Sequence, residues 1–291
     1  MRPTFMASVY NMVNGKHKQH GMGSVPDARD NRDLDYKRLT LDSKFLELPE
    51  TVSLAHLLPK ENWDQGSLSA GASFAANLLV SAVQTKLGVP YSRPSWMATW
   101  HWAKAHMYGL PLSHQDVGCS TREALISIKR EGILLDSRFP YGPQHLTRMP
   151  DYEMRADAKH PPVLFYRIDD INEPLDIDFV LRCLAEGWPL VVSLPIYHTF
   201  ETGYSDGMVP LPKARDNIEG YQALVLYGYY IKGQNPFFRA RLSWGSWGGR
   251  HLTPSGRQVE GGTCRIPVDY VAEDGFDCWT ARPVEMVTTQ G

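Results

Sequence analysis

The sequence predicts an α+β protein with a mainly helical first part and a β-rich second part. Helix-like apolar spacing dominates the first half, and from about residue 163 the chain turns to short β-rich runs such as "LVVSLPI", "ALVLYGYYI" and "FFRARLSW". With 43% hydrophobic residues, the 291-residue chain can bury a sizeable core. We expect one continuous two-lobed unit, with an N-terminal arm at 1–45, a mainly helical lobe at 46–162 and a mainly β lobe at 163–291.

The helices are predicted from apolar periodicity and from residues that favour helix ends. The apolar residues of 74–83 recur at helical spacing, and Ser67 or Ser69 is placed to cap the start of that helix. Two further helices are predicted for "SWMATWHWAKAHMYG" and "TREALISIKREG", the second ending at Gly132. A fourth, "LDIDFVLRCLAEG", lies between the predicted strands "PVLFYRI" and "LVVSLPI".

The first 45 residues are polar and rich in turn-forming residues. We therefore expect an arm that lies over the surface, or a partly disordered leader. No apolar run reaches the roughly 18 residues of a membrane helix, and the N-terminus lacks the continuous apolar segment of a signal peptide. The sequence accordingly predicts no membrane contact and a cytoplasmic location, which is the host cytoplasm if the gene is viral.

The four cysteines are widely separated and form no CxxC pair: Cys119, Cys183, Cys264 and Cys278. We expect free thiols, with no metal site and no cofactor. The formal net charge is -2, but acidic residues are unevenly distributed. The segments 65–115 and 220–259 contain no Asp or Glu. These two segments are therefore locally basic.

Six stretches in the same order resemble the papain-like cysteine peptidases, particularly the compact bacterial and phage members without disulfides. They are "GSVPDARDNRDLDY", "LPETVSLAHLLPKENWDQGSL", "TREALISIKREGILLDSRFPYG", "LAEGWPLVVSLPIYHTF", "GMVPLPKARDNIEGYQALVLYGYY" and "RARLSWGSWGG". The resemblance covers about residues 21–271. It implies a papain-like two-lobe fold, with a helical lobe, an antiparallel barrel-like β lobe and a groove between them.

The resemblance also implies where a catalytic triad would lie. The nucleophile position falls on Gly71, the base on Gln222 and the orienting residue on Leu242, while 243–245 keep the family's Ser-Trp-Gly. Catalysis in this family needs a thiolate paired with an imidazole, and neither glycine nor glutamine supplies one. Gln65 matches the family's oxyanion-stabilising side chain and should point into the groove, where Gly71 and Gln222 face each other. The sequence therefore predicts a pseudopeptidase rather than an enzyme.

For the ligand, the sequence narrowly favours single-stranded RNA. The acid-free segment 220–259 holds five basic and eight aromatic residues, which suit phosphate contacts and base stacking. The predicted nucleic-acid-binding residues are Lys232, Arg239, Arg241, Arg250, Arg257, Tyr229, Tyr230 and Trp247. Arg239 and Arg241 alternate, which predicts one exposed strand face, although about half of the aromatics are expected to pack inward.

Other interpretations stay open at this point. The free N–H groups at the start of the helix near Gly71 suit a phosphate, or equally water. A peptide or protein partner in the vestigial substrate groove, held by strand addition and apolar pockets, is the alternative to RNA. A structural role in a viral assembly is a third alternative.

Overall fold

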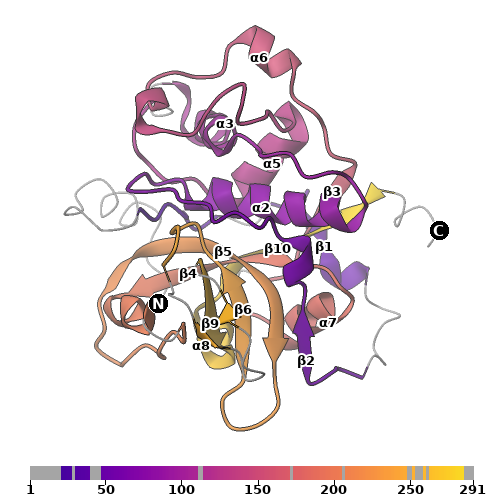
Figure 1. Cartoon of the computed structure of the whole chain (residues 1–291), viewed down its shortest axis with the longest axis vertical. Coiled ribbons are helices and arrows are strands. Elements are labelled where there is room, and N and C mark those ends of the chain that lie inside the picture. Colours follow the sequence, from indigo (N-terminus) through magenta and orange to yellow (C-terminus); the bar gives the residue numbers. More distant parts are fainter. Residues whose placement is uncertain are drawn as a thin grey trace.

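Helix α2 (Gly71–Lys86) runs between a group of helices and a β-sheet, and the rest of the chain is arranged around it (Figure 1). The computed structural model describes residues 21–27, 30–39, 47–110, 114–170, 173–204, 207–247, 251–252, 258–259 and 262–284. On one side of α2 lie α3 (Trp96–Tyr108), α5 (Thr121–Glu131) and α6 (Tyr152–Ala156) (Figure 1). The strands lie on the other side, with α7 (Ile177–Ala185) and α8 (Val268–Asp274) among them.

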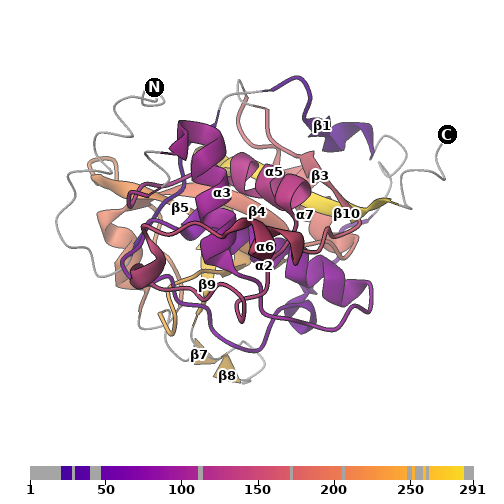
Figure 2. The same ribbon diagram turned by 90° about the horizontal axis from the view of Figure 1, so that it is seen from above.

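The described residues form an eight-stranded sheet that is mostly antiparallel. Its order is β1–β3–β10–β4–β5–β6–β9, and β2 pairs with β5 beside this path. The β1–β3 pairing is parallel. The strands are β1 (Leu34–Asp35), β2 (Thr51–Ser53), β3 (Val163–Arg167), β4 (Leu190–Tyr197), β5 (Ile218–Tyr230), β6 (Phe237–Arg241), β9 (Thr263–Pro267) and β10 (Phe276–Pro283). A separate hairpin of β7 (His251–Leu252) and β8 (Gln258–Val259) lies at the margin of the molecule (Figure 2).

Helix α2 is buried along most of its length because it carries small and apolar residues on every side. All of its residues from Gly71 to Val83 are buried, and its first charged residue is Lys86. Helices α3 and α5 also form where the sequence predicts them, and α5 ends at Gly132, whose φ of 82° suits glycine. The predicted cap of α2 is wrong, because the helix follows Ala70 and has no side-chain cap.

Strand β5 lies inside the sheet and is covered on both faces. It pairs with β4 and β2 on one edge and with β6 on the other, and it contacts both α2 and α7. Its residues Gln222–Tyr229 are buried without a break. Side chains alternate between the two faces of a strand, so continuous burial means that neither face reaches solvent here.

The four cysteines are buried and free, as predicted. Burial raises the pKa of the Cys119 thiol to about 12, so the thiol stays protonated near neutral pH. Within the ranges that the structure describes, no helix is long and apolar enough to cross a bilayer.

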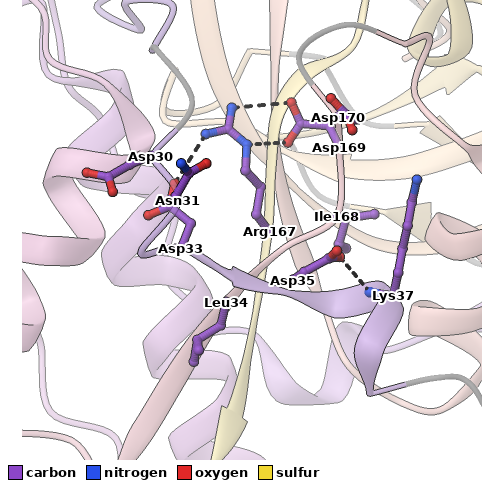
Figure 3. Close-up of a pocket in the computed structure, with 10 residues that line it drawn as sticks. All are labelled: Asp30, Asn31, Asp33, Leu34, Asp35, Lys37, Arg167, Ile168, Asp169 and Asp170. Carbon is purple, nitrogen blue, oxygen red and sulfur yellow. Dashed lines mark hydrogen bonds and ion pairs between the residues drawn. The ribbon is translucent and has the colours of Figure 1, made fainter.

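The predicted surface arm is wrong for residues 21–25, which are buried, while residues 1–20 lie outside the described part. The segment that follows is held by one arginine from each lobe. Arg122 of α5 binds Asp30 (2.9 Å) and Asp33 (2.8 Å), and Arg167 of β3 reaches the other oxygen of Asp33 at 3.6 Å. Figure 3 shows Arg167 beside Asp33, where both residues line a pocket of about 240 Å³. Asp33 therefore ties the N-terminal segment to both lobes.

Candidate functional site

Three residues that the resemblance placed around a catalytic centre lie together where the lobes meet. Gly71 begins α2, Gln222 lies on β5, and Gln65 lies in the turn before α2. The Gln222 Nε2 donates to Gln65 Oε1 at 2.9 Å. A Cβ atom on Gly71 would lie only 2.3 Å from Gln222 Oε1. The Gln222 side chain thus fills the space that a side chain at position 71 would need.

Ser243 completes this polar cluster, and Leu242 takes no part in it. Gln222 Nε2 also donates to Ser243 Oγ (3.0 Å), and the Ser243 hydroxyl donates to Gln65 Oε1. The Leu242 side chain is buried in the apolar core instead. We call Gln65, Gln222 and Ser243 the amide cluster. Its members carry amide and hydroxyl groups, which do not gain or lose a proton near neutral pH.

The position of Gln65 is fixed by the backbone around it. Its N–H donates to the Ser243 carbonyl (2.8 Å), and its own carbonyl accepts from the Tyr141 hydroxyl (2.9 Å). The Tyr141 ring packs edge-on against Phe74 of α2, with ring centroids 5.1 Å apart. Gln65 therefore joins the start of α2 to the end of β6, and its side chain points into the junction between the lobes.

The carbonyl oxygen of Met22 lies at the focus of two converging donors. It accepts a hydrogen bond from Gln65 Nε2 at 2.8 Å and another from the Gly71 N–H at 3.1 Å. A side-chain amide and a backbone N–H at a helix start together suit an oxygen that carries negative charge. The N–H that the sequence assigned to a phosphate or to water is therefore occupied by the chain itself, and Met22 takes the place of the predicted serine cap.

Residues 21–25 are bound along their whole length, mainly through their backbone. Besides the two bonds to Met22, the contacts are Gly21 N–H to Gly66 O (2.7 Å), Trp244 Nε1 to Gly21 O (3.0 Å), Gly23 and Ser24 N–H to Tyr221 O (both 3.1 Å), Val25 N–H to Cys119 O (3.1 Å), Cys119 N–H to Gly23 O (3.1 Å) and Ser24 Oγ to Ser193 Oγ (2.7 Å). We call the place that holds this segment the slot. Its walls are the turn 66–70, residues 118–119 and residues 221–222.

Sequence reasoning missed the segment 21–25 as part of the site. It had placed this stretch in a surface arm, because the flanking residues are polar. A signal was nevertheless present, since "GMGSV" sets two glycines around an apolar residue within an otherwise charged stretch. The sequence shows Ser243 within the family's Ser-Trp-Gly, but it does not predict the hydrogen bond with Gln222.

Two aromatic residues of the predicted RNA surface are not exposed. Tyr229 lies in the buried run of β5, and Trp247 is buried with its ring stacked on Phe200 at 5.5 Å. The expectation that they are available for base stacking is wrong, because β5 is covered on both faces at Tyr229 and because Trp247 packs against Phe200 and Trp244. Tyr230 is partly buried, and its ring lies 5.5 Å from that of Phe237.

The basic residues of that surface are also less available than the acid-free sequence suggests. Arg241 donates to the Glu61 carbonyl and to Asn62 Oδ1, and Lys232 forms an ion pair with Glu50 at 2.5 Å. These partners come from a part of the chain far away in sequence. Arg239 is partly buried, with its guanidinium 5.5 Å from the centre of the Phe237 ring. Arg250 and Arg257 lie outside the described residues.

A metal-dependent site finds no support in this geometry. Among the residues that the structure describes, no group of three or more His, Cys, Asp or Glu side chains is arranged to hold a metal ion. Cys119 contributes its backbone to the slot, while its thiol is buried and protonated. What the lobe junction offers is therefore a set of fixed hydrogen-bond donors and acceptors.

Comparison with known proteins identifies the fold. No protein-family model matches the sequence, and no curated protein matches it significantly. Solved structures of papain-like C1 cysteine peptidases match its fold. Xylellain, a cysteine protease from Xylella fastidiosa, is 23% identical over 92% of this chain and 98% of its own, with a TM-score of 0.76.

Two further solved structures are similar. Digestive procathepsin L 3 from the larval midgut of Tenebrio molitor is 17% identical, covering 92% of this chain and 76% of its own, with a TM-score of 0.63. Procathepsin B S9 from Trypanosoma congolense is 15% identical, and the match covers 97% of this chain and 98% of its own, with a TM-score of 0.61. At these identities the likeness shows the fold alone. The chain has the papain-like two-lobe α+β fold that the sequence predicts.

Proposed function

We propose that this protein is a non-catalytic papain-fold protein whose slot binds an extended polypeptide segment. In the structure, the bound segment is residues 21–25 of the same chain. The observation that carries the proposal is the Met22 carbonyl, which accepts from both Gln65 Nε2 and the Gly71 N–H. The donors that could stabilise an oxyanion in a peptidase here bind a resting peptide group instead.

The chemistry at the junction supports the absence of peptidase activity. A cysteine peptidase needs a thiolate and a neighbouring base, and the amide cluster supplies neither. The Ser243 hydroxyl is bonded to two amide side chains, which cannot accept its proton near neutral pH. A nucleophile at position 71 would first have to displace the Gln222 side chain.

The hydrogen-bonding pattern of the slot favours a peptide over a nucleic acid. The slot presents donors from Gln65 and Gly71, and it presents carbonyl acceptors from Gly66 and Tyr221. Cys119 supplies one backbone N–H donor and one carbonyl acceptor. A peptide backbone carries both donors and acceptors and can satisfy this alternation, whereas a phosphate accepts only and would face unpaired carbonyl oxygens. RNA binding elsewhere on the β lobe stays a prediction from the sequence.

The proposal predicts no peptidase activity, even when the slot is opened. We expect turnover of casein and of fluorogenic peptide mixtures at the buffer background for the wild-type chain and for Gly23→Ala. The variant matters because it distinguishes a blocked catalytic site from a missing one, since an alanine at this position should displace residues 21–25. A papain assay under the same conditions is the positive control. Turnover that a thiol-alkylating reagent abolishes, in either form, would overturn the proposal.

A further inference from the structure

The contacts of residues 21–24 carry information about which peptides the slot accepts. Resting on the proposed function, we infer that the slot selects extended peptides of the form Gly-x-Gly-Ser, with an apolar side chain at x, and that residues 21–24 are an internal copy of this ligand. The ligand class is thus a glycine-containing peptide segment, presented by a partner protein. The chain's own copy then competes with that partner for the slot.

The first glycine is required by a wall that is made of backbone. A Cβ atom on Gly21 would lie 2.1 Å from the Leu68 carbonyl oxygen. That oxygen is held in place, because it accepts from Gln65 Nε2 (2.7 Å) and from the Ala70 N–H (2.9 Å). The wall cannot retreat without breaking these bonds, and Gln65 is the same side chain that binds Met22. Any residue other than glycine is therefore disfavoured at this position.

The second glycine is required for two independent reasons. Gly23 has a φ of 125°, which side chains with a Cβ rarely adopt, and its Cβ atom would lie 2.1 Å from the Ser69 carbonyl oxygen. The Ser69 N–H is itself bound by Asp116 Oδ1 at 2.7 Å. On the opposite wall, a Cβ atom on Gly118 would lie 2.6 Å from the Gly23 carbonyl oxygen. The slot is therefore closely fitted to the backbone from both sides.

The remaining two positions have side-chain requirements of their own. The Met22 side chain lies in the hydrophobic core cluster, and the residue is 9% exposed. Ser24 is fully buried, and its hydroxyl is 2.7 Å from Ser193 Oγ, which lies 3.2 Å from Thr121 Oγ1. A peptide without a hydroxyl at this place would leave a buried polar pair incomplete. Together these contacts define an apolar position followed by glycine and serine.

The test uses the full chain with the internal copy displaced. Gly23→Ala should displace residues 21–25, while Arg122 and Arg167 continue to hold the segment that follows them. Gly233→Ala is the matched control, because Gly233 has a φ of 92° but no atom within 4 Å of its Cβ position. It reproduces the backbone strain without obstructing the slot. Thermal unfolding first establishes that both variants fold.

The probes are the blocked peptide Gly-Met-Gly-Ser-Val and three relatives with alanine at the first glycine, the second glycine or the serine, titrated by calorimetry. We expect Gly23→Ala to bind the parent peptide, and to bind each glycine-to-alanine peptide about 10–100-fold more weakly. The serine-to-alanine peptide should bind about 10-fold more weakly. The wild-type chain and Gly233→Ala should bind the parent at least about 10-fold more weakly than Gly23→Ala, because their slot is filled.

The possible outcomes separate the selectivity from the proposed function. Equal affinity of Gly23→Ala for the parent and the alanine peptides overturns the inferred selectivity but leaves a peptide-binding slot. Failure of a folded Gly23→Ala to bind any of the peptides overturns both. If Gly23→Ala does not fold, the peptide titration is replaced by a measurement of amide hydrogen exchange at residues 21–25 of the wild-type chain. Excess parent peptide should accelerate that exchange, and acceleration by neither parent nor alanine peptides would overturn the inference.

Discussion

Replacing Arg122 by methionine is expected to lower the free energy of unfolding by about 3–5 kcal/mol, because it removes the cation from a largely buried ion-pair network. The Arg122 side chain is 10% exposed. Its guanidinium lies 2.8–3.6 Å from the carboxylates of Asp27, Asp30, Asp33 and Glu123. Methionine preserves the apolar stem but leaves these carboxylates facing one another. Urea denaturation of both proteins at pH 7 measures the difference.

The matched control for this prediction is Arg138→Met. Arg138 also binds an aspartate, Asp157, at 2.6 Å, but the two side chains are 51% and 49% exposed. An exposed pair contributes little, so we expect a loss below about 1 kcal/mol. A deficit equal to that of Arg138→Met would contradict the role assigned to Arg122.

The substitution Gly71→Ala is expected to destabilise the protein by about 1–3 kcal/mol, although alanine is the better helix former. The added Cβ atom would lie 2.3 Å from Gln222 Oε1, and Gln222 can move away only by giving up its bonds to Gln65 and Ser243. The same substitution in a Gln222→Ala background should cost close to zero, because the shorter side chain leaves room. Unfolding free energies of the two single variants and the double variant measure the coupling between positions 71 and 222.

The single variant Gln222→Ala is the control for this set of three variants. Gln222→Ala alone should be destabilising, since it removes two buried hydrogen bonds. The informative quantity is the coupling energy, which we expect to be about 1–3 kcal/mol and favourable in the double variant. Additive effects of the two substitutions would contradict the statement that the Gln222 side chain fills the space beside Gly71.

Local sequence signals predicted much of the fold. The helix α5 was predictable because its apolar spacing and its terminal Gly132 are properties of neighbouring residues. The approach of Gln65, Gly71 and Gln222 was predictable because the resemblance assigned each of them to one centre. The resemblance assigned the orienting position to Leu242, but the hydrogen bond to Gln222 comes from its neighbour Ser243. Neighbouring residues in an extended backbone point their side chains in opposite directions. Motif spacing alone therefore did not show which of residues 242 and 243 faces Gln222.

The occupant of the slot could not be predicted from local sequence. Met22 and Gln65 are 43 residues apart, and the bond between them depends on the path of a polar segment that has no periodicity to interpret. The prediction of exposed aromatic residues on β5 was wrong for a different reason. Alternation predicts exposed residues only if one face of a strand is open, and the burial of Tyr229 and its neighbours on β5 depends on helices from both lobes. The ion pair of Lys232 with Glu50 is a long-range contact of the same kind.

The central claim is that residues 21–25 occupy the slot through their backbone, and amide hydrogen exchange of the wild-type protein tests it most directly. The N–H groups of Gly23, Ser24 and Val25 donate to carbonyl oxygens of the slot, and the Gly71 N–H donates to Met22. We expect these four amides to exchange at least about 10³-fold more slowly than in an unstructured peptide. Exchange of Gly23, Ser24 and Val25 at the rate of an unstructured peptide would contradict the account, because the segment would then lie outside the slot.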